Sequence, residues 1–122
     1  MDILVTNNPL VETQYKTGFL VEYQDTNMLE ILMTVRDKVH IGYKILTHPL
    51  SGSLKPNEAE YKTVLLSGTP AETDPQSVTI IEESIQTALK FQPKPTPEQY
   101  KKDKQIVDLS LIQAAIGNCT KN

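Results

Sequence analysis

Short apolar runs alternate along this chain with segments whose apolar residues recur at helical spacing, and this alternation is the strongest constraint on its fold. Residues 3–5, 19–23, 43–47 and 62–66 are rich in Ile, Leu, Val and Tyr, and each run is followed by polar or turn-forming residues. Such runs predict β-strands. The first run is entirely apolar and predicts a central strand, whereas Glu22 places the second run nearer a sheet edge.

Helix start and stop signals lie between these runs. Asn27 predicts an N-cap, because its side chain can accept from the free amides of a first turn, and Asp74 before Pro75 predicts another. Residues 96–99 repeat the same pattern. Gly42 and Gly117 follow the first and last helical patterns and predict their ends.

Strands that alternate with helices predict an α/β fold. We expect a three-layer open sheet of about four mostly parallel strands, with helices on both faces. If the strands at Ile3 and Ile45 are parallel, the chain between them, which includes the Asn27 helix, forms a right-handed crossover. The length of 122 residues and the mass of 13.7 kDa suit one α/β domain over residues 1–122.

Composition excludes several classes of protein. Fifteen acidic against 12 basic residues give a net charge of −3 and a pI near 5.3, and Arg36 is the single arginine, which argues against a nucleic-acid partner. Cys119 is the single cysteine, which excludes an internal disulfide and a CxxC motif. No basic start with a long apolar stretch and no apolar run of ~20 residues is present, so we expect a cytoplasmic chain without a membrane partner.

Polar loops follow the first and third predicted strands. If those strands are parallel neighbours, the loops emerge side by side at the carboxyl ends, where ligands bind in open parallel sheets. The loops offer amide and hydroxyl donors, an open backbone amide, a positive charge and an imidazole. This set suits a small anion or a carboxylate metabolite. The predicted ligand-binding residues are Asn7, Asn8, His48, Ser51, Gly52, Ser53 and Lys55.

Three other interpretations stay open. The same residues are ordinary turn formers, so the loops can be purely structural. A small enzyme could use His48 as acid or base with Lys55 stabilising an anion. The wide apolar surface of the last helix could instead form a homo-oligomer. The glycine spacing matches neither GxGxxG nor a P-loop, and no metal-ligand spacing occurs, so we predict no catalytic residue, cofactor or metal.

Several segments resemble the GrdX family. The longest is residues 35–58, VRDKVHIGYKILTHPLSGSLKPNE, of which His-Pro-Leu-Ser-Gly-Ser at 48–53 is the most specific part. The opening Thr-Asn-Asn-Pro at 6–9, the strand at 61–66 and the segment at 107–112 are also similar. The resemblance therefore covers most of the chain.

The resemblance implies a metabolic setting. GrdX-like proteins are encoded with the selenium-dependent glycine, sarcosine and betaine reductases of anaerobic amino-acid fermenters, so it implies a place in Stickland-type glycine reduction. This chain has no selenocysteine and no redox cysteine pair. An accessory or regulatory role is what remains, with no assigned molecular activity. We therefore expect a binding protein rather than an enzyme, whose partners are a small anionic ligand or a reductase subunit.

Overall fold

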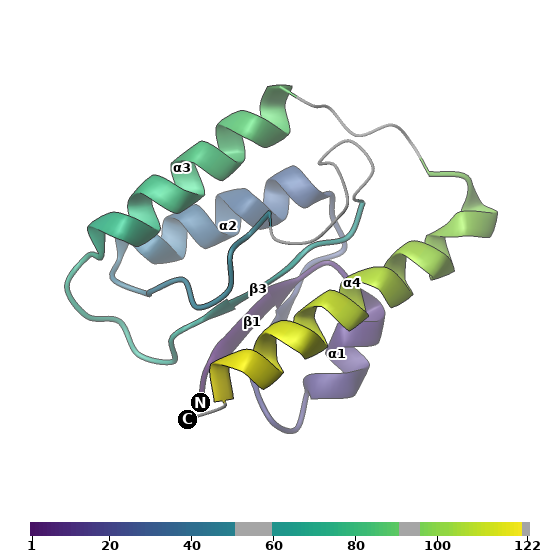
Figure 1. The fold of residues 1–122 in the computed structure, drawn as a ribbon, viewed down its shortest axis with the longest axis horizontal. Coiled ribbons are helices and arrows are strands. Elements are labelled where there is room, and N and C mark those ends of the chain that lie inside the picture. The colour runs from purple at the N-terminus through teal and green to yellow at the C-terminus, as the bar shows by residue number, and fades with distance from the viewer. Residues whose placement is uncertain (51–59, 91–95, 121–122) are drawn as a thin grey trace.

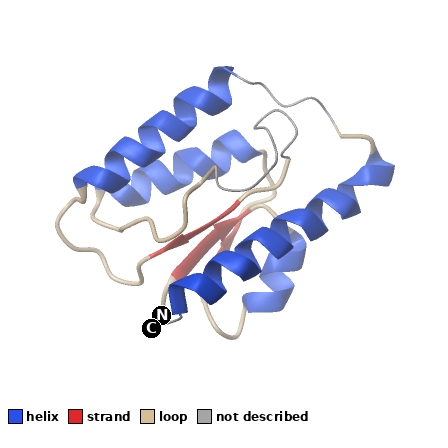
Figure 2. Cartoon of the chain, in the orientation of Figure 1, coloured by secondary structure: helices blue, strands red, loops and turns tan. Residues whose placement is uncertain are grey.

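The computed structural model describes residues 1–50, 60–90 and 96–120, and the described chain has an α/β fold (Figure 2). The elements in these residues are β1 (Ile3–Thr6), α1 (Pro9–Tyr15), β2 (Leu20–Tyr23), α2 (Met28–His40), β3 (Thr63–Leu66), α3 (Pro75–Lys90) and α4 (Glu98–Thr120). None of the helices in these residues combines the length and the apolar character needed to cross a bilayer.

The sheet has three strands in the order β2-β1-β3. β1 is central, as its apolar run predicts, and it runs parallel to β2 with Ile3 beside Leu20. It runs antiparallel to β3, where Ile3 pairs with Leu66 and Thr6 with Thr63. The sheet is therefore small and mixed, and the expected set of about four mostly parallel strands is not found in the described residues.

The crossover between the parallel strands β1 and β2 passes through α1. The Asn8 side chain caps this helix by accepting from the Leu10 amide at 3.0 Å, and Pro9 occupies its first position. The predicted crossover through the Asn27 helix to Ile45 required a second strand at Ile45, and the structure has only an isolated bridge there. A helix of seven residues is too short to display a clear apolar stripe, and Val11 is its one buried residue.

Residues 43–47 form no strand, which corrects a second expectation. Ile45 makes an isolated antiparallel bridge with Leu66. Beyond this bridge, side-chain hydroxyls accept from backbone amides that a longer strand pair would bond to backbone carbonyls. The amide of Ile45 donates to Ser77 Oγ at 3.0 Å, and the amide of Leu65 donates to Thr47 Oγ1 at 2.9 Å. The segment therefore lies along the outer edge of β3, away from the sheet centre.

The predicted caps of α2 and α3 are confirmed. The amide of Glu30 donates to Asn27 Oδ1 at 2.9 Å. Asp74 Oδ2 accepts from both the amide and the hydroxyl of Ser77, at 3.0 and 2.7 Å. The hydroxyl bond lowers the pKa of Asp74. The predicted end of the last helix at Gly117 is wrong, because α4 continues to Thr120.

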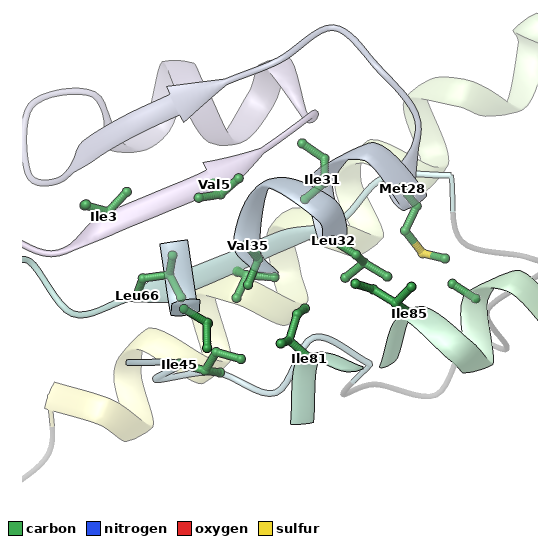
Figure 3. Close-up of a cluster of buried hydrophobic side chains, with 13 residues drawn as sticks. Ile3, Val5, Met28, Ile31, Leu32, Val35, Ile45, Leu66, Ile81 and Ile85 are labelled. Carbon is green, nitrogen blue, oxygen red and sulfur yellow. The ribbon is translucent and has the colours of Figure 1, made fainter. Parts of the chain in front are cut away.

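The larger apolar core lies between one face of the sheet and helices α2 and α3 (Figures 1 and 3). Alternate residues of β1 and β3 point to this face. The apolar residues of α2 that recur at helical spacing are buried, and α3 contributes Ile81 and Ile85, whereas Leu89 of α3 is 44% exposed. The buried members are Ile3, Val5, Met28, Ile31, Leu32, Val35, Val39, Ile45, Val64, Leu66, Ile81, Ile85 and Ala88.

A second core lies on the opposite face, beneath α1 and α4 (Figure 1). Its buried members are Leu4, Val11, Leu65 and Ile112. Because Leu4 and Leu65 alternate with residues of the larger core, the sheet is apolar on both faces. α4 rests here on the face that carries Ile112.

We predict that Gly42→Ala destabilises the fold by on the order of 1–3 kcal/mol. Gly42 has φ 112°, and an added Cβ would overlap the carbonyl oxygen of Ala71. Gly18→Ala is the matched control, because nothing lies within 4 Å of its Cβ position. Urea unfolding of both variants tests this, and equal midpoints would contradict it.

Candidate functional site

A cleft of about 550 Å³ opens where β1 and β2 end. Because the two strands are parallel, their carboxyl ends meet at one edge of the sheet, which is where α/β proteins bind ligands. Its walls come from Asn7 after β1, residues 23–27 at the end of β2 and in the turn to α2, residues 60–61 before β3, and residues 98–105 at the start of α4.

The cleft carries charges of both signs. Asp25, Glu60 and Glu98 contribute carboxylates, and Lys101 and Lys102 contribute ammonium groups. The Lys101 ammonium lies 3.3 Å from a Glu98 carboxylate oxygen. Its hydrogen bond to Glu98, with the negative charge of Glu98 and of Glu60, raises the pKa of Lys101, so it stays cationic at neutral pH.

Two tyrosines face the same cleft from different segments. Burial raises the pKa of Tyr23, and the charge of nearby Asp25 adds to this effect. The Tyr61 hydroxyl oxygen accepts from Gln105 Nε2 at 3.1 Å. Because that bond uses the oxygen of Tyr61, its own proton remains able to donate to another acceptor.

A buried hydrogen-bond chain lies beside the cleft and ends at Asp108. The Asn8 amide donates to Thr6 Oγ1 at 2.9 Å, and the Thr6 and Thr63 hydroxyl oxygens are 2.7 Å apart. Thr63 Oγ1 donates to Asp108 Oδ2 at 2.8 Å, so Thr6 must supply the proton between the two hydroxyls. Each donor in this series of hydrogen bonds therefore points toward the Asp108 carboxylate. Consecutive hydrogen bonds of this kind polarise and strengthen one another.

Lys62 is a buried cation near that carboxylate. It is 7% exposed, and it borders a small void with Asp108 and Thr47 that has room for about one water molecule. Burial lowers the pKa of Lys62, and the charge of Asp108 opposes this shift. Asp108 lies in a mostly apolar stretch of the sequence, residues 106–112, and it is buried in the structure.

The predicted site residues Asn7 and Asn8 lie at the expected edge, and their side-chain amides are engaged by protein groups. Asn7 Nδ2 donates to the carbonyls of Thr26 and Glu60 at 2.8 and 3.0 Å, and Oδ1 accepts from the Lys62 amide. Asn8 Nδ2 donates to the Gln105 carbonyl and to Asp108. Both side chains therefore hold neighbouring segments together around the cleft, and a direct ligand contact by them stays a prediction.

His48 lies exposed on the other side of β3. The segment that leads to it runs antiparallel to β3, hence in the direction of β1, so His48 and Asn7 lie toward the same edge with β3 between them. His48 Nδ1 accepts from the Leu50 amide at 3.1 Å. The predicted residues Ser51, Gly52, Ser53 and Lys55 lie outside the described residues.

Sequence reasoning missed the side chains that line the cleft from β2 and α4. The loop that contains Asp25 follows β2, which is parallel to β1. This position at the carboxyl edge can be predicted only if α1 is recognised as the crossover helix between the two strands. Lys101 and Lys102 sit in an ordinary charged helix start, and nothing local predicts that this helix start meets the sheet edge. In the described part of the chain, no three His, Cys, Asp or Glu residues are grouped as a metal site would require.

Comparison with protein families gives one match. The family model described as GrdX-like protein matches residues 3–117. Neither the curated proteins nor the solved structures contain a match to the chain. The matched range includes every residue that lines the cleft and the hydrogen-bonded series that ends at Asp108.

We predict that Asp108→Ala destabilises the fold by about 3–5 kcal/mol. The substitution removes the acceptor of Thr63 and Asn8 and leaves the Lys62 ammonium buried without its opposite charge. Asp103→Ala on the exposed side of the same helix is the control, for which we expect a change within about 0.5 kcal/mol. Urea unfolding measures both, and similar losses in the two variants would contradict this role.

We predict that Lys62 makes the stability of the fold increase with pH below 10.5. Burial lowers the pKa of Lys62 in the folded chain below the ordinary value of 10.5. Between the folded pKa and 10.5, the unfolded chain therefore binds more protons than the folded chain. The free energy of unfolding should therefore rise with pH relative to Lys62→Met, which has no ammonium to titrate. Parallel pH profiles for the two proteins between neutrality and 10.5 would show that Lys62 ionises normally.

Proposed function

The chain belongs to the GrdX-like family, and from that premise we propose that it is an accessory or regulatory protein of glycine, betaine and sarcosine reduction that binds a small anionic metabolite. Membership of the family associates the chain with glycine reductase systems. The cleft at the carboxyl ends of β1 and β2 supplies the binding site in this proposal. The protein acts by binding, and no step of bond making or breaking is assigned to it.

The single observation that carries the proposal is the pair of lysines in this cleft. Lys101 and Lys102 are consecutive residues near the start of α4, and both line a hollow of about 550 Å³ at the edge where α/β folds bind ligands. A metabolite with a carboxylate or phosphate group finds two ammonium groups there, and Asn27 at the N-terminus of α2 lies in the same wall.

The surroundings of the cleft support binding by a preformed site. Asn7 joins three segments of the wall through its side-chain amide, and Gln105 fixes the Tyr61 hydroxyl. A site whose groups are already held in place loses less conformational freedom when a ligand binds. A ligand contact by His48 stays a prediction of the sequence, and β3 lies between His48 and the cleft residue Asn7.

A second candidate is docking of a reductase subunit on α4. Its outer surface exposes Tyr100, Ile106 and Val107, with 51%, 47% and 39% of each residue accessible. Exposed apolar groups of this size on one helix are typical of contact surfaces. This candidate replaces metabolite binding if the cleft binds no small molecule.

Calorimetric titration of the full chain tests metabolite binding. The ligands are glycine, sarcosine, betaine, acetyl phosphate and phosphate, and at least one should bind at a single site at millimolar concentration or below. Lys102→Gln should weaken that binding by about tenfold, because a charge-assisted contact is lost. Lys16→Gln, an exposed lysine at the end of α1, should leave it unchanged.

Silence across the whole panel would overturn metabolite binding. Binding that survives substitution of both Lys101 and Lys102 by Gln would overturn the cleft as the binding site, because the ligand would then lie elsewhere.

A further inference from the structure

The negative charges of the cleft are a feature that binding of a simple anion does not explain. Three carboxylates, on Asp25, Glu60 and Glu98, face two ammonium groups, so the wall has a net charge of −1 when all five are ionised. Glu98 is paired with Lys101. Asp25 and Glu60 therefore remain to repel a phosphate or to attract a cation.

One carboxylate oxygen of Glu60 accepts no hydrogen bond from the described residues. This atom, Oε2, is shielded from solvent. A buried carboxylate oxygen without a donor is unfavourable, and an N–H group that reaches it from the cleft would satisfy it. The same wall holds the rings of Tyr23 and Tyr61, whose faces attract a cationic nitrogen.

The positive side of the cleft lies close to this acidic side. Lys102 is exposed and has no ion pair among the described residues, so its ammonium is available to a carboxylate. Glu60 lies near enough to Lys101 to raise the pKa of that lysine. The two charges of a matching ligand must therefore also lie close together.

We propose that the cleft binds a small zwitterion, in which an ammonium group with N–H donors lies next to a carboxylate, as in an α-amino acid. The inference rests on the proposed function and names the class of its ligand. The ammonium contacts Glu60 and Asp25, and the carboxylate contacts Lys102. A simple anion or a simple cation satisfies one side of the cleft and is repelled by the other.

Calorimetric titration of the full chain with glycine, acetate and methylammonium tests the pairing of charges. Acetate and methylammonium each carry one of the two charged groups of glycine. We expect glycine to bind at least about tenfold more tightly than either. N-methylglycine and N,N,N-trimethylglycine extend the series, and the trimethyl compound should bind more weakly than glycine because it has no N–H for Glu60.

Two variants separate the two sides of the cleft. Glu60→Gln should weaken glycine by about tenfold and leave acetate unchanged or stronger, whereas Lys102→Gln should weaken glycine and acetate and spare methylammonium. Glu72→Gln, at an exposed position that does not line the cleft, should change none of them. Circular dichroism of each variant verifies that it is folded.

The possible results distinguish this inference from the proposed function. If phosphate, acetyl phosphate or acetate binds as tightly as glycine, or if Glu60→Gln strengthens glycine, the zwitterion is overturned and metabolite binding stands. If no member of either series binds, both are overturned.

Discussion

The buried carboxylate of Asp108 is the contact on which the arrangement of the sheet edge depends. It accepts from Thr63 at the start of β3 and from Asn8 at the start of α1, and Lys62 supplies the nearest opposite charge. One side chain of α4 therefore joins the end of the central strand, the start of its antiparallel neighbour and the crossover helix. Removing any one partner leaves another polar group buried without a partner, which is why the group is stable only as a whole.

This anchoring explains why the lining of the cleft comes from four separate segments. Asp108 and Gln105 hold α4 against the sheet, so the turns that precede them carry Lys101 and Lys102 over the carboxyl ends of β1 and β2. Asn7 performs the corresponding role from the strand side. The polar residues at the centre of the edge are structural, and the residues able to meet a ligand lie around them.

Local features of the fold could be predicted from the sequence, and long-range features could not. The caps at Asn27 and Asp74 and the central position of residues 3–5 depend on near neighbours in the chain, and these predictions are confirmed. The direction of β3 and the loss of a strand at 43–47 depend on partners such as Ser77, which lies about thirty residues away. The candidate site shows the same division. Asn7 was predicted at the end of the strand at residues 3–5, which closely precedes it, whereas the sequence did not predict that Lys101, forty positions beyond Tyr61, lies in the same cleft.

The most direct test of the account is amide chemical-shift mapping of the folded chain during a glycine titration. If the carboxyl-end cleft is the binding site, the amides of residues 25–27, 60–62 and 101–105 should shift together along one saturating curve. These groups are far apart in the sequence and meet at the cleft. Shifts confined to the outer surface of α4, or absent from all three groups, would contradict the account.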